Sequence, residues 1–191
     1  MKQHADWIIH DIGQLVTLDG PPVPRRGAEQ AFLGLIEKAA VAIGGERILA
    51  AGPQDDVLGA FVAPAGRSLD AMGGVVLPGF VDPHTHLLFA GTREKEFELR
   101  CQGHTYMEIA AAGGGIRSSV RAFRAASDET LLAQSRRRLD RMLRFGTTTA
   151  EAKSGYGLET EQEIRAVDRR ARQAPRCRSG AHLHGRARVS R

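Results

Sequence analysis

The chain lacks the features that mark secreted and membrane-spanning proteins. It has two cysteines among 191 residues, Cys101 and Cys177, which are too few for a disulfide framework. No apolar run reaches the length of a membrane span. The first residues, MKQHADW, lack the charged and then apolar pattern of a signal peptide. We therefore expect a soluble, cytoplasmic protein with no membrane partner.

Aromatic residues are also scarce, at 5%, whereas hydrophobic residues make up 42% and glycine occurs 22 times. This composition suffices for a globular domain with a hydrophobic core. The formal net charge of +5 is unevenly distributed. Residues 165–191 contain nine arginines and one acid, Asp168, so residues 1–164 are mildly acidic. The overall basic charge therefore does not indicate a nucleic-acid partner.

Residues 1–74 have the pattern of a small, mostly β module. Apolar and polar residues alternate loosely over 5–18, and the sequence DGPP at 19–22 then interrupts the pattern. Residues 21–38 are interpreted as an irregular insertion. Residues 39–43 and 47–51 flank the turn sequence GGE, which predicts a β-hairpin.

Residues 75–172 instead alternate between strand-like and helix-like segments. Apolar or β-branched runs at 75–81 and 147–152 predict strands. Ser or Thr residues at the start of amphipathic segments predict helices that begin near Thr105, Ser127 and Thr160. Strand, loop and helix in repeated succession indicate a parallel α/β architecture.

Two of these helices have a predicted buried face. In the helix that follows Ser127, this face consists of Leu132, Leu139, Met142 and Leu143. In the helix that follows Thr160, with Glu163 expected to complete its cap, Ile164 and Val167 are expected to point inward.

The first of the two strands leads directly into a pair of histidines, His84 and His86. Residues two apart in an extended chain lie on the same face, so both imidazoles can reach one ion. Neutral imidazole is a good ligand for zinc or iron, and a metal so bound can activate water as a nucleophile. The spacing therefore predicts a metal site at the carboxyl end of this strand.

Four segments in order resemble the imidazolonepropionase family of the amidohydrolase superfamily. They are PGFVDPHTHLLFAG at 78–91, GHTYMEI at 103–109, GGGI at 113–116 and KSGYG at 153–157. The resemblance covers roughly residues 5–170. It implies a hydrolase of histidine degradation that acts on carbon–nitrogen bonds in cyclic amidines. Such an enzyme opens the imidazolone ring of 4-imidazolone-5-propanoate to give N-formimidoyl-L-glutamate.

The same resemblance implies the fold and the site. Residues 1–74 would form a small β-sandwich, and residues 75–172 the first βα units of a (β/α)₈ TIM-like barrel. One zinc or iron ion would be held by His84 and His86, with Arg93 binding the substrate propanoate and Tyr156 contacting substrate and product. The full-length family also implies a homodimer. No residue is assigned as the catalytic acid or base.

Each site residue also has a simpler interpretation. Arg93 lies in the charged run REKE and can pair with its neighbours, and Tyr156 can cap the barrel rim. Lys153 and Glu151 are interpreted as structural residues, and the glycines at 113–115 as a tight turn rather than a phosphate loop.

The end of the chain departs from the family pattern. A (β/α)₈ barrel needs about 250 residues, so the family implies that this chain is truncated. Residues 173–191 form an Arg-rich tail that we expect to be disordered, and we hypothesise a shift of reading frame near residue 173. His182 and His184 in this tail are interpreted as chance occurrences.

We expect the fragment to fold poorly and to have little activity alone. Two other functions stay open. One is another cyclic amide or amidine amidohydrolase or a deaminase, and the other is a basic fragment without enzymatic activity.

Overall fold

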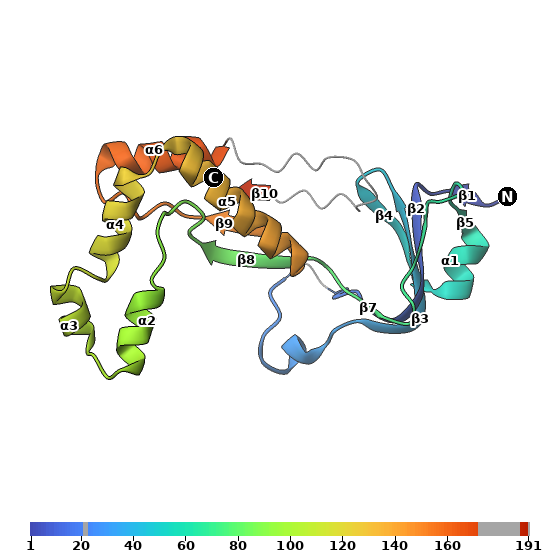
Figure 1. Ribbon diagram of the computed structural model, residues 1–191. Coiled ribbons are helices and arrows are strands. Elements are labelled where there is room, and N and C mark those ends of the chain that lie inside the picture. The colour runs from blue at the N-terminus through green and yellow to red at the C-terminus, as the bar shows by residue number, and fades with distance from the viewer. Residues whose placement is uncertain (21–22, 172–187, 191) are drawn as a thin grey trace. The chain divides into compact units, whose positions relative to one another are not determined.

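A computed structural model describes residues 1–20, 23–171 and 188–190. The chain divides into two compact units, Met1–Pro78 and Gly79–Arg191 (Figure 1). The division therefore lies four residues beyond the expected boundary at residue 74.

The first unit is built on a mixed five-stranded sheet with the order β4-β3-β2-β6, in which β7 also pairs with β2. The predicted hairpin is confirmed as the antiparallel pair β3 and β4, whereas β6 and β7 run parallel to β2. The strands are β2 (Trp7–Val16), β3 (Leu35–Gly44), β4 (Arg47–Pro53), β6 (Ser68–Asp70) and β7 (Val75–Val76). The expected insertion at 21–38 is therefore wrong at its end, because residue 35 already lies in β3.

A bulge in β2 places apolar side chains on both faces of this sheet. The pairing register with β3 shifts between Ile9 and Ile12, where Asp11 has a φ of 52°. The extra residue lets Ile9 and Ile12, three apart, join the same buried cluster. On the other face, Ile8 packs in a cluster with Val57 of a short helix. The remaining elements are β1 (Gln3–His4), which pairs with β5 (Phe61–Val62), a 3₁₀ helix at Gly27–Ala31, and α1 (Gln54–Ala60).

The second unit contains a three-stranded parallel sheet with the order β10-β9-β8. Its strands are β8 (Phe80–Thr85), β9 (Thr147–Ala152) and β10 (Arg188–Ser190). The strand predicted at 75–81 is thus two strands, since β7 pairs in the first unit and β8 begins only at Phe80. Pro78 between them has no amide proton to donate to a sheet. The β8–α–β9 succession is consistent with part of a barrel of alternating strands and helices.

Helices make up most of the described residues of the second unit. They are α2 (Glu94–Cys101), α3 (Tyr106–Ala111), α4 (Ile116–Ala125), α5 (Asp128–Arg144) and α6 (Thr160–Ala171). The predicted start of α3 is confirmed by a capping box between Thr105 and Glu108, and Ser127 caps α5 as expected. Helices α2 and α4 were not predicted. Figure 1 shows that α2, α3 and α4 lie beyond the end toward which β8 points.

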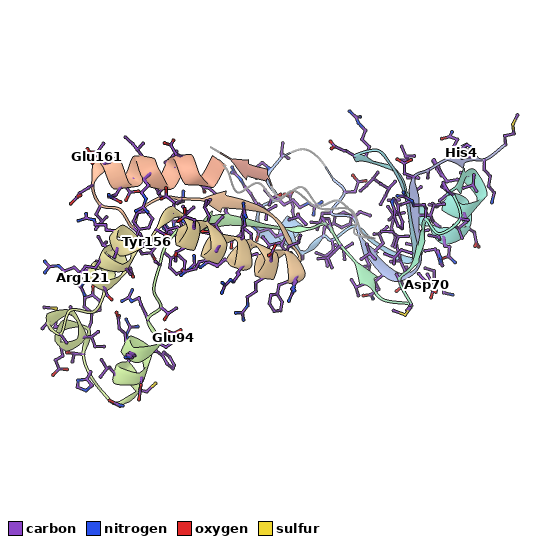
Figure 2. All side chains as sticks on the ribbon, turned by 45° about the horizontal axis from the view of Figure 1, so that its top comes forward. His4, Asp70, Glu94, Arg121, Tyr156 and Glu161 are labelled. Atoms are coloured by element: carbon purple, nitrogen blue, oxygen red, sulfur yellow. The ribbon has the colours of Figure 1, made fainter. Side chains whose placement is uncertain are left out.

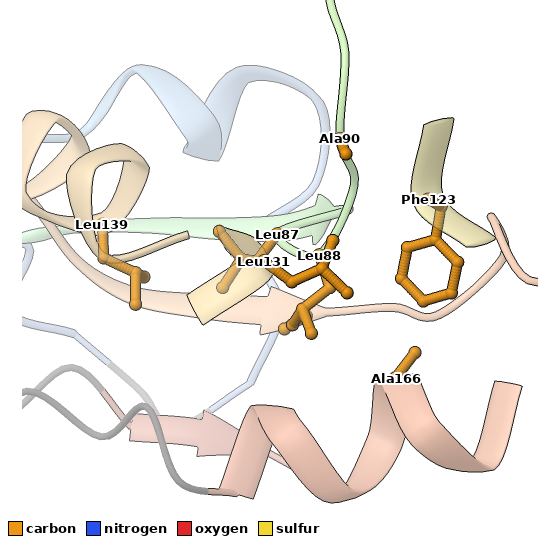
Figure 3. Packing of buried hydrophobic residues seen from close by; sticks show 8 residues of the cluster. Leu87, Leu88, Ala90, Phe123, Leu131, Leu139 and Ala166 are labelled. Carbon is orange, nitrogen blue, oxygen red and sulfur yellow. The ribbon is translucent and has the colours of Figure 1, made fainter. Parts of the chain in front are cut away.

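The core of the second unit lies between its sheet and its helices. Figure 3 shows buried side chains from several segments of the unit meeting there. They are Leu87, Leu88 and Ala90 after β8, Phe123 of α4, Leu131 and Leu139 of α5, Ala152 of β9, and Ala166 of α6.

The predicted buried faces of α5 and α6 are partly wrong. Leu131, not Leu132, is fully buried, and Leu143 is 38% exposed. In α6, Ile164 and Val167 are 55% and 43% exposed, whereas Ala166 is buried. Both helices are therefore rotated relative to the faces predicted from their large apolar residues.

Two further expectations concern the chain as a whole. Among the described residues, no helix is both long enough and apolar enough to cross a lipid bilayer. In the tail, residues 188–190 form β10 and pair with β9, while residues 172–187 and 191, including His182 and His184, lie outside the described residues.

Candidate metal and substrate site

The candidate site begins at the carboxyl end of β8. His84 is the second-last residue of this strand, and His86 follows its end. Thr85, between them, is tied to β9, because its hydroxyl donates to the Glu151 carbonyl at 3.0 Å and its own carbonyl accepts from the Lys153 amide at 2.8 Å. The two imidazole rings lie together, with centroids 5.6 Å apart and planes at 64°. The expected pairing of the rings is therefore seen.

The environment of His86 fits a ligand. The ring is half-buried, and its Nδ1 atom is buried without a hydrogen-bond partner among the described residues. An unsatisfied buried polar atom costs about 1–3 kcal/mol, so such an atom calls for a partner. A cation coordinated by Nδ1 would supply one. The chemistry of the two imidazoles therefore fits zinc or iron.

Tyr156 is brought to the same place by the loop after β9. Its ring centroid lies 5.3 Å from that of His86 and 5.6 Å from that of Phe89 (Tyr156 is labelled in Figure 2). Gly155 allows this approach, because a Cβ atom on it would lie 3.0 Å from Cε1 of His86. The loop thus places an aromatic hydroxyl-bearing side chain beside the histidine pair.

Two charged residues hold the Tyr156 loop from neighbouring helices. Glu163 of α6 accepts hydrogen bonds from the amides of Gly157 and Leu158 at 2.7 and 2.8 Å. Arg124 of α4 donates to the Gly157 carbonyl at 2.7 and 3.0 Å. Burial acts to raise the pKa of Glu163, but the hydrogen bonds it receives outweigh this effect and lower it. Glu163, which we expected to cap α6, instead organises the loop that precedes the helix.

Arg93 is engaged with a carboxylate of its own chain. Its Nε and Nη2 atoms donate to one oxygen of Glu96 at 2.8 and 2.6 Å, and the side chain is 41% exposed. This hydrogen bond raises the pKa of Arg93, and Tyr156 and Tyr106 act electrostatically in the same direction. The structure therefore confirms that Arg93 pairs with a neighbour in the charged run, Glu96. Nη1 is not part of this pair, so the substrate-binding role stays a prediction.

The other charged candidates have structural partners. Lys153 pairs with Glu151 at 2.7 Å, a contact that the sequence did not predict. The triple glycine forms the connection between α3 and α4, in which Gly113 and Gly115 have φ values of 88° and 70°. The Gly115 amide donates to Glu96 at 2.9 Å, so the turn serves the Arg93 ion pair. No group of three or more His, Cys, Asp and Glu residues that could hold a metal occurs in the described part of the chain.

Sequence comparison identifies the relatives of this chain. No family model matches it. It is 51% identical to the imidazolonepropionase of Herpetosiphon aurantiacus over 165 residues, which are 86% of this chain and 38% of that protein. It is 52% identical to the imidazolonepropionase of Chloroflexus aggregans over 163 residues, 85% of this chain and 38% of that protein. The resemblance to the imidazolonepropionases is confirmed. The chain spans about two fifths of the length of these relatives.

One solved structure has a similar fold over most of this chain. A zinc-bound adenosine deaminase from Xanthomonas campestris matches with a TM-score of 0.52 and 20% identity, over 88% of this chain and 32% of that one. At this identity the match speaks for the fold alone. It supports part of an α/β barrel for the described residues.

Sequence reasoning found His84, His86 and Tyr156, which the structure brings together, and Arg93, which lies within electrostatic range of Tyr156. It missed the residues that support them. These are Phe89, Arg124, Ser135, Arg138 and Glu163. Most of their contacts join segments that are distant in sequence, and Glu163 bonds to the loop before α6 instead of capping the helix. Short sequence motifs therefore do not predict these contacts.

Proposed function

We propose that this chain carries part of the site of a metal-dependent hydrolase that opens the ring of 4-imidazolone-5-propanoate to N-formimidoyl-L-glutamate. The proposal depends chiefly on one observation, the two adjacent imidazoles at the end of β8 with a buried nitrogen that lacks a partner among the described residues. About 50% identity to imidazolonepropionases over most of the chain supports the substrate. Because the chain spans only 38% of these relatives, the activity of a whole protein is itself part of the proposal.

His84 and His86 would hold one zinc or iron ion. When bound, such an ion lowers the pKa of a coordinated water to about 7 and polarises a carbonyl oxygen. The chain's own residues would orient the substrate around it. Tyr156 stands against His86, where its hydroxyl can hydrogen-bond a polar edge of the heterocycle. Arg93 would bind the propanoate through the guanidinium donors that Glu96 leaves available.

We also propose the finer fold that the family implies. The sheet of the first unit would be part of a β-sandwich, and β8, β9 and β10 would be strands of a (β/α)₈ barrel. In such barrels the active site lies at the carboxyl ends of the strands, which is where His84, His86 and Tyr156 occur.

The metal site is tested on the purified 191-residue chain by titration with zinc and with iron. We expect one ion per chain, and affinity reduced at least about tenfold in His84→Ala and His86→Ala. His104→Ala removes an exposed imidazole between α2 and α3 and should leave the metal affinity unchanged. Unchanged affinity in the His86→Ala variant would contradict the site. Two imidazoles are fewer than the three protein ligands of a usual catalytic zinc site, so we expect weak binding and little turnover by the chain alone.

The reaction is tested in a chimera. The matching 165 residues of the Herpetosiphon aurantiacus relative are replaced by those of this chain. We expect the chimera to open the imidazolone ring and its His86→Ala version to lose this activity. Arg93→Met should raise KM more than it lowers kcat if the guanidinium binds the propanoate in the ground state. A folded, metal-loaded chimera without ring-opening activity would refute the proposal.

A further inference from the structure

The backbone immediately after His86 is held by the side chains of α5. The carbonyl oxygen of Leu87 lies 2.9 Å from the Ser135 hydroxyl and 2.9 Å from Nη1 of Arg138, which donates to it. Ser135 is fully buried and Leu87 is 3% exposed. These contacts fix the peptide that follows the second candidate metal ligand.

The same guanidinium also supports the aromatic side of the site. Its central carbon lies 3.5 Å from the centroid of the Phe89 ring. Phe89 in turn lies 5.6 Å from Tyr156, and Tyr156 lies 5.3 Å from His86. Arg138 thus contacts the Leu87 carbonyl on one side and the Phe89 ring on the other, and Phe89 lies next to Tyr156.

Arg138 carries a desolvation cost that an apolar side chain filling the same space would not have. Burial lowers its pKa, yet a guanidinium remains charged in proteins. Its nitrogen donors go to neutral oxygens, the Leu87 carbonyl and the Gln134 side chain. A partly buried cation is stabilised less by neutral acceptors than by a carboxylate, and an apolar side chain of similar length would pack without desolvating a charge. A flat, charged fork, however, can both donate to a carbonyl and stack on a ring.

We propose that Arg138 is a positioning residue that sets the Tyr156 ring against His86 by joining Phe89 to the Leu87 carbonyl. It acts through these neighbours and does not itself touch the metal or the substrate. The inference extends the proposed function, because the His86–Tyr156 pair is the arrangement that the hydrolase site would require.

The experiment uses the full 191-residue chain without metal. Ring-to-ring nuclear Overhauser effects between Tyr156 and His86 are measured in the wild type and in Arg138→Met. We expect the wild type to show them and Arg138→Met to lose them while keeping its far-ultraviolet circular dichroism. Arg137→Met is the matched control, since it removes the same charge from the adjacent, exposed position of α5 and should keep the contact. A Tyr156–His86 contact of wild-type strength in folded Arg138→Met would overturn the inference.

Arg138→Lys keeps the charge and a donor but loses the planar stack. If Arg138→Met does not fold, the lysine variant decides, and we expect it to fold with a weakened Tyr156–His86 contact. A lysine variant with the full wild-type contact would overturn the role of the stack.

Zinc titration separates this inference from the proposed function. We expect Arg138→Met to bind zinc at least about tenfold more weakly than Arg137→Met, as for other residues that orient a ligand. A wild-type chain that binds no zinc would refute the proposed metal site. The Tyr156–His86 ring contact, measured without metal, would still test the positioning role of Arg138.

Discussion

Glu96 joins Arg93 to the start of α4. One oxygen of its carboxylate accepts two hydrogen bonds from the Arg93 guanidinium, and the other accepts the Gly115 amide at 2.9 Å. The contact with Arg93 is the main cause that lowers the pKa of Glu96, and the Gly115 amide adds to it. One side chain therefore orients the predicted substrate arginine and closes the turn between α3 and α4.

Glu96→Gln should destabilise the chain in a pH-dependent way. A carboxyl whose pKa is lower in the folded state contributes stability above its unfolded pKa, and this contribution is lost as the pH falls through the folded value. We therefore expect Glu96→Gln to be less stable than the wild type at pH 7, and the difference to disappear as the pH falls through the lowered folded pKa of Glu96. Urea unfolding across this range measures it. Glu98→Gln removes the same charge from the same helix without touching Arg93, and a similar pH-dependent loss there would contradict the role of the pair.

Glu163→Gln should loosen the loop that carries Tyr156. The carboxylate receives the Gly157 and Leu158 amides, and its lowered pKa shows that the folded state favours the charged form. Replacing the charged acceptor with a neutral one should cost about 1 kcal/mol, because the site is only partly buried. Hydrogen exchange at these two amides should accelerate by about fivefold. The loss of stability should be complete above the unfolded pKa of Glu163 and should disappear as the pH falls through its lowered folded pKa.

Glu161→Gln is the control for this change, because it lies two residues away on the exposed side of α6. Exchange at Gly157 and Leu158 that is equally fast in both variants would show that general charge, and not the hydrogen bonds, protects the loop.

The orientation of α5 gives a direct test of packing. Leu131 is fully buried, whereas Leu132 is only half-buried. Leu131→Ala should cost about 2–5 kcal/mol of unfolding free energy, as expected for a buried leucine. Leu132→Ala should cost about 1 kcal/mol or less. Denaturant titration of both variants measures the difference, and a larger loss in Leu132→Ala than in Leu131→Ala would mean that α5 packs by the face predicted from the sequence.

The sequence predicts the proximity of the two imidazoles and the starts of α3 and α5, because these features depend on local rules. Residues two apart in a strand share a face, and Thr105 and Ser127 cap the helices that follow them. The buried face of α5 could not be predicted in the same way. It includes the buried Ser135 and the partly buried Arg138, which a pattern of large apolar residues excludes and whose side chains donate to the Leu87 carbonyl.

The supporting contacts of the site were missed for a related reason. The Arg138–Leu87 and Arg124–Gly157 hydrogen bonds join residues 51 and 33 positions apart. No short sequence pattern predicts such pairs, because they form only when the helices pack on the sheet. Glu163 shows the same effect at short range, since a spacing typical of a helix cap instead serves the preceding loop.

Gly155→Ala should disturb the candidate metal site through a single added methyl group. Gly155 has a φ of 140°, which disfavours other residues, and the new Cβ atom would lie 3.0 Å from Cε1 and 3.5 Å from Nδ1 of His86. The imidazole or the loop must move, so zinc affinity should fall by about tenfold. The backbone strain adds about 1–3 kcal/mol of destabilisation.

Gly103→Ala separates the two effects. Gly103 also has a positive φ, 94°, but no described atom lies within 4 Å of the position that its new methyl group would take. This variant should lose stability through backbone strain and keep wild-type zinc affinity, because its methyl group meets no part of the site. Zinc titration and thermal unfolding of both variants make the comparison. Equal zinc affinity in the two would mean that the close approach of Gly155 to His86 does not constrain the imidazole that the metal requires.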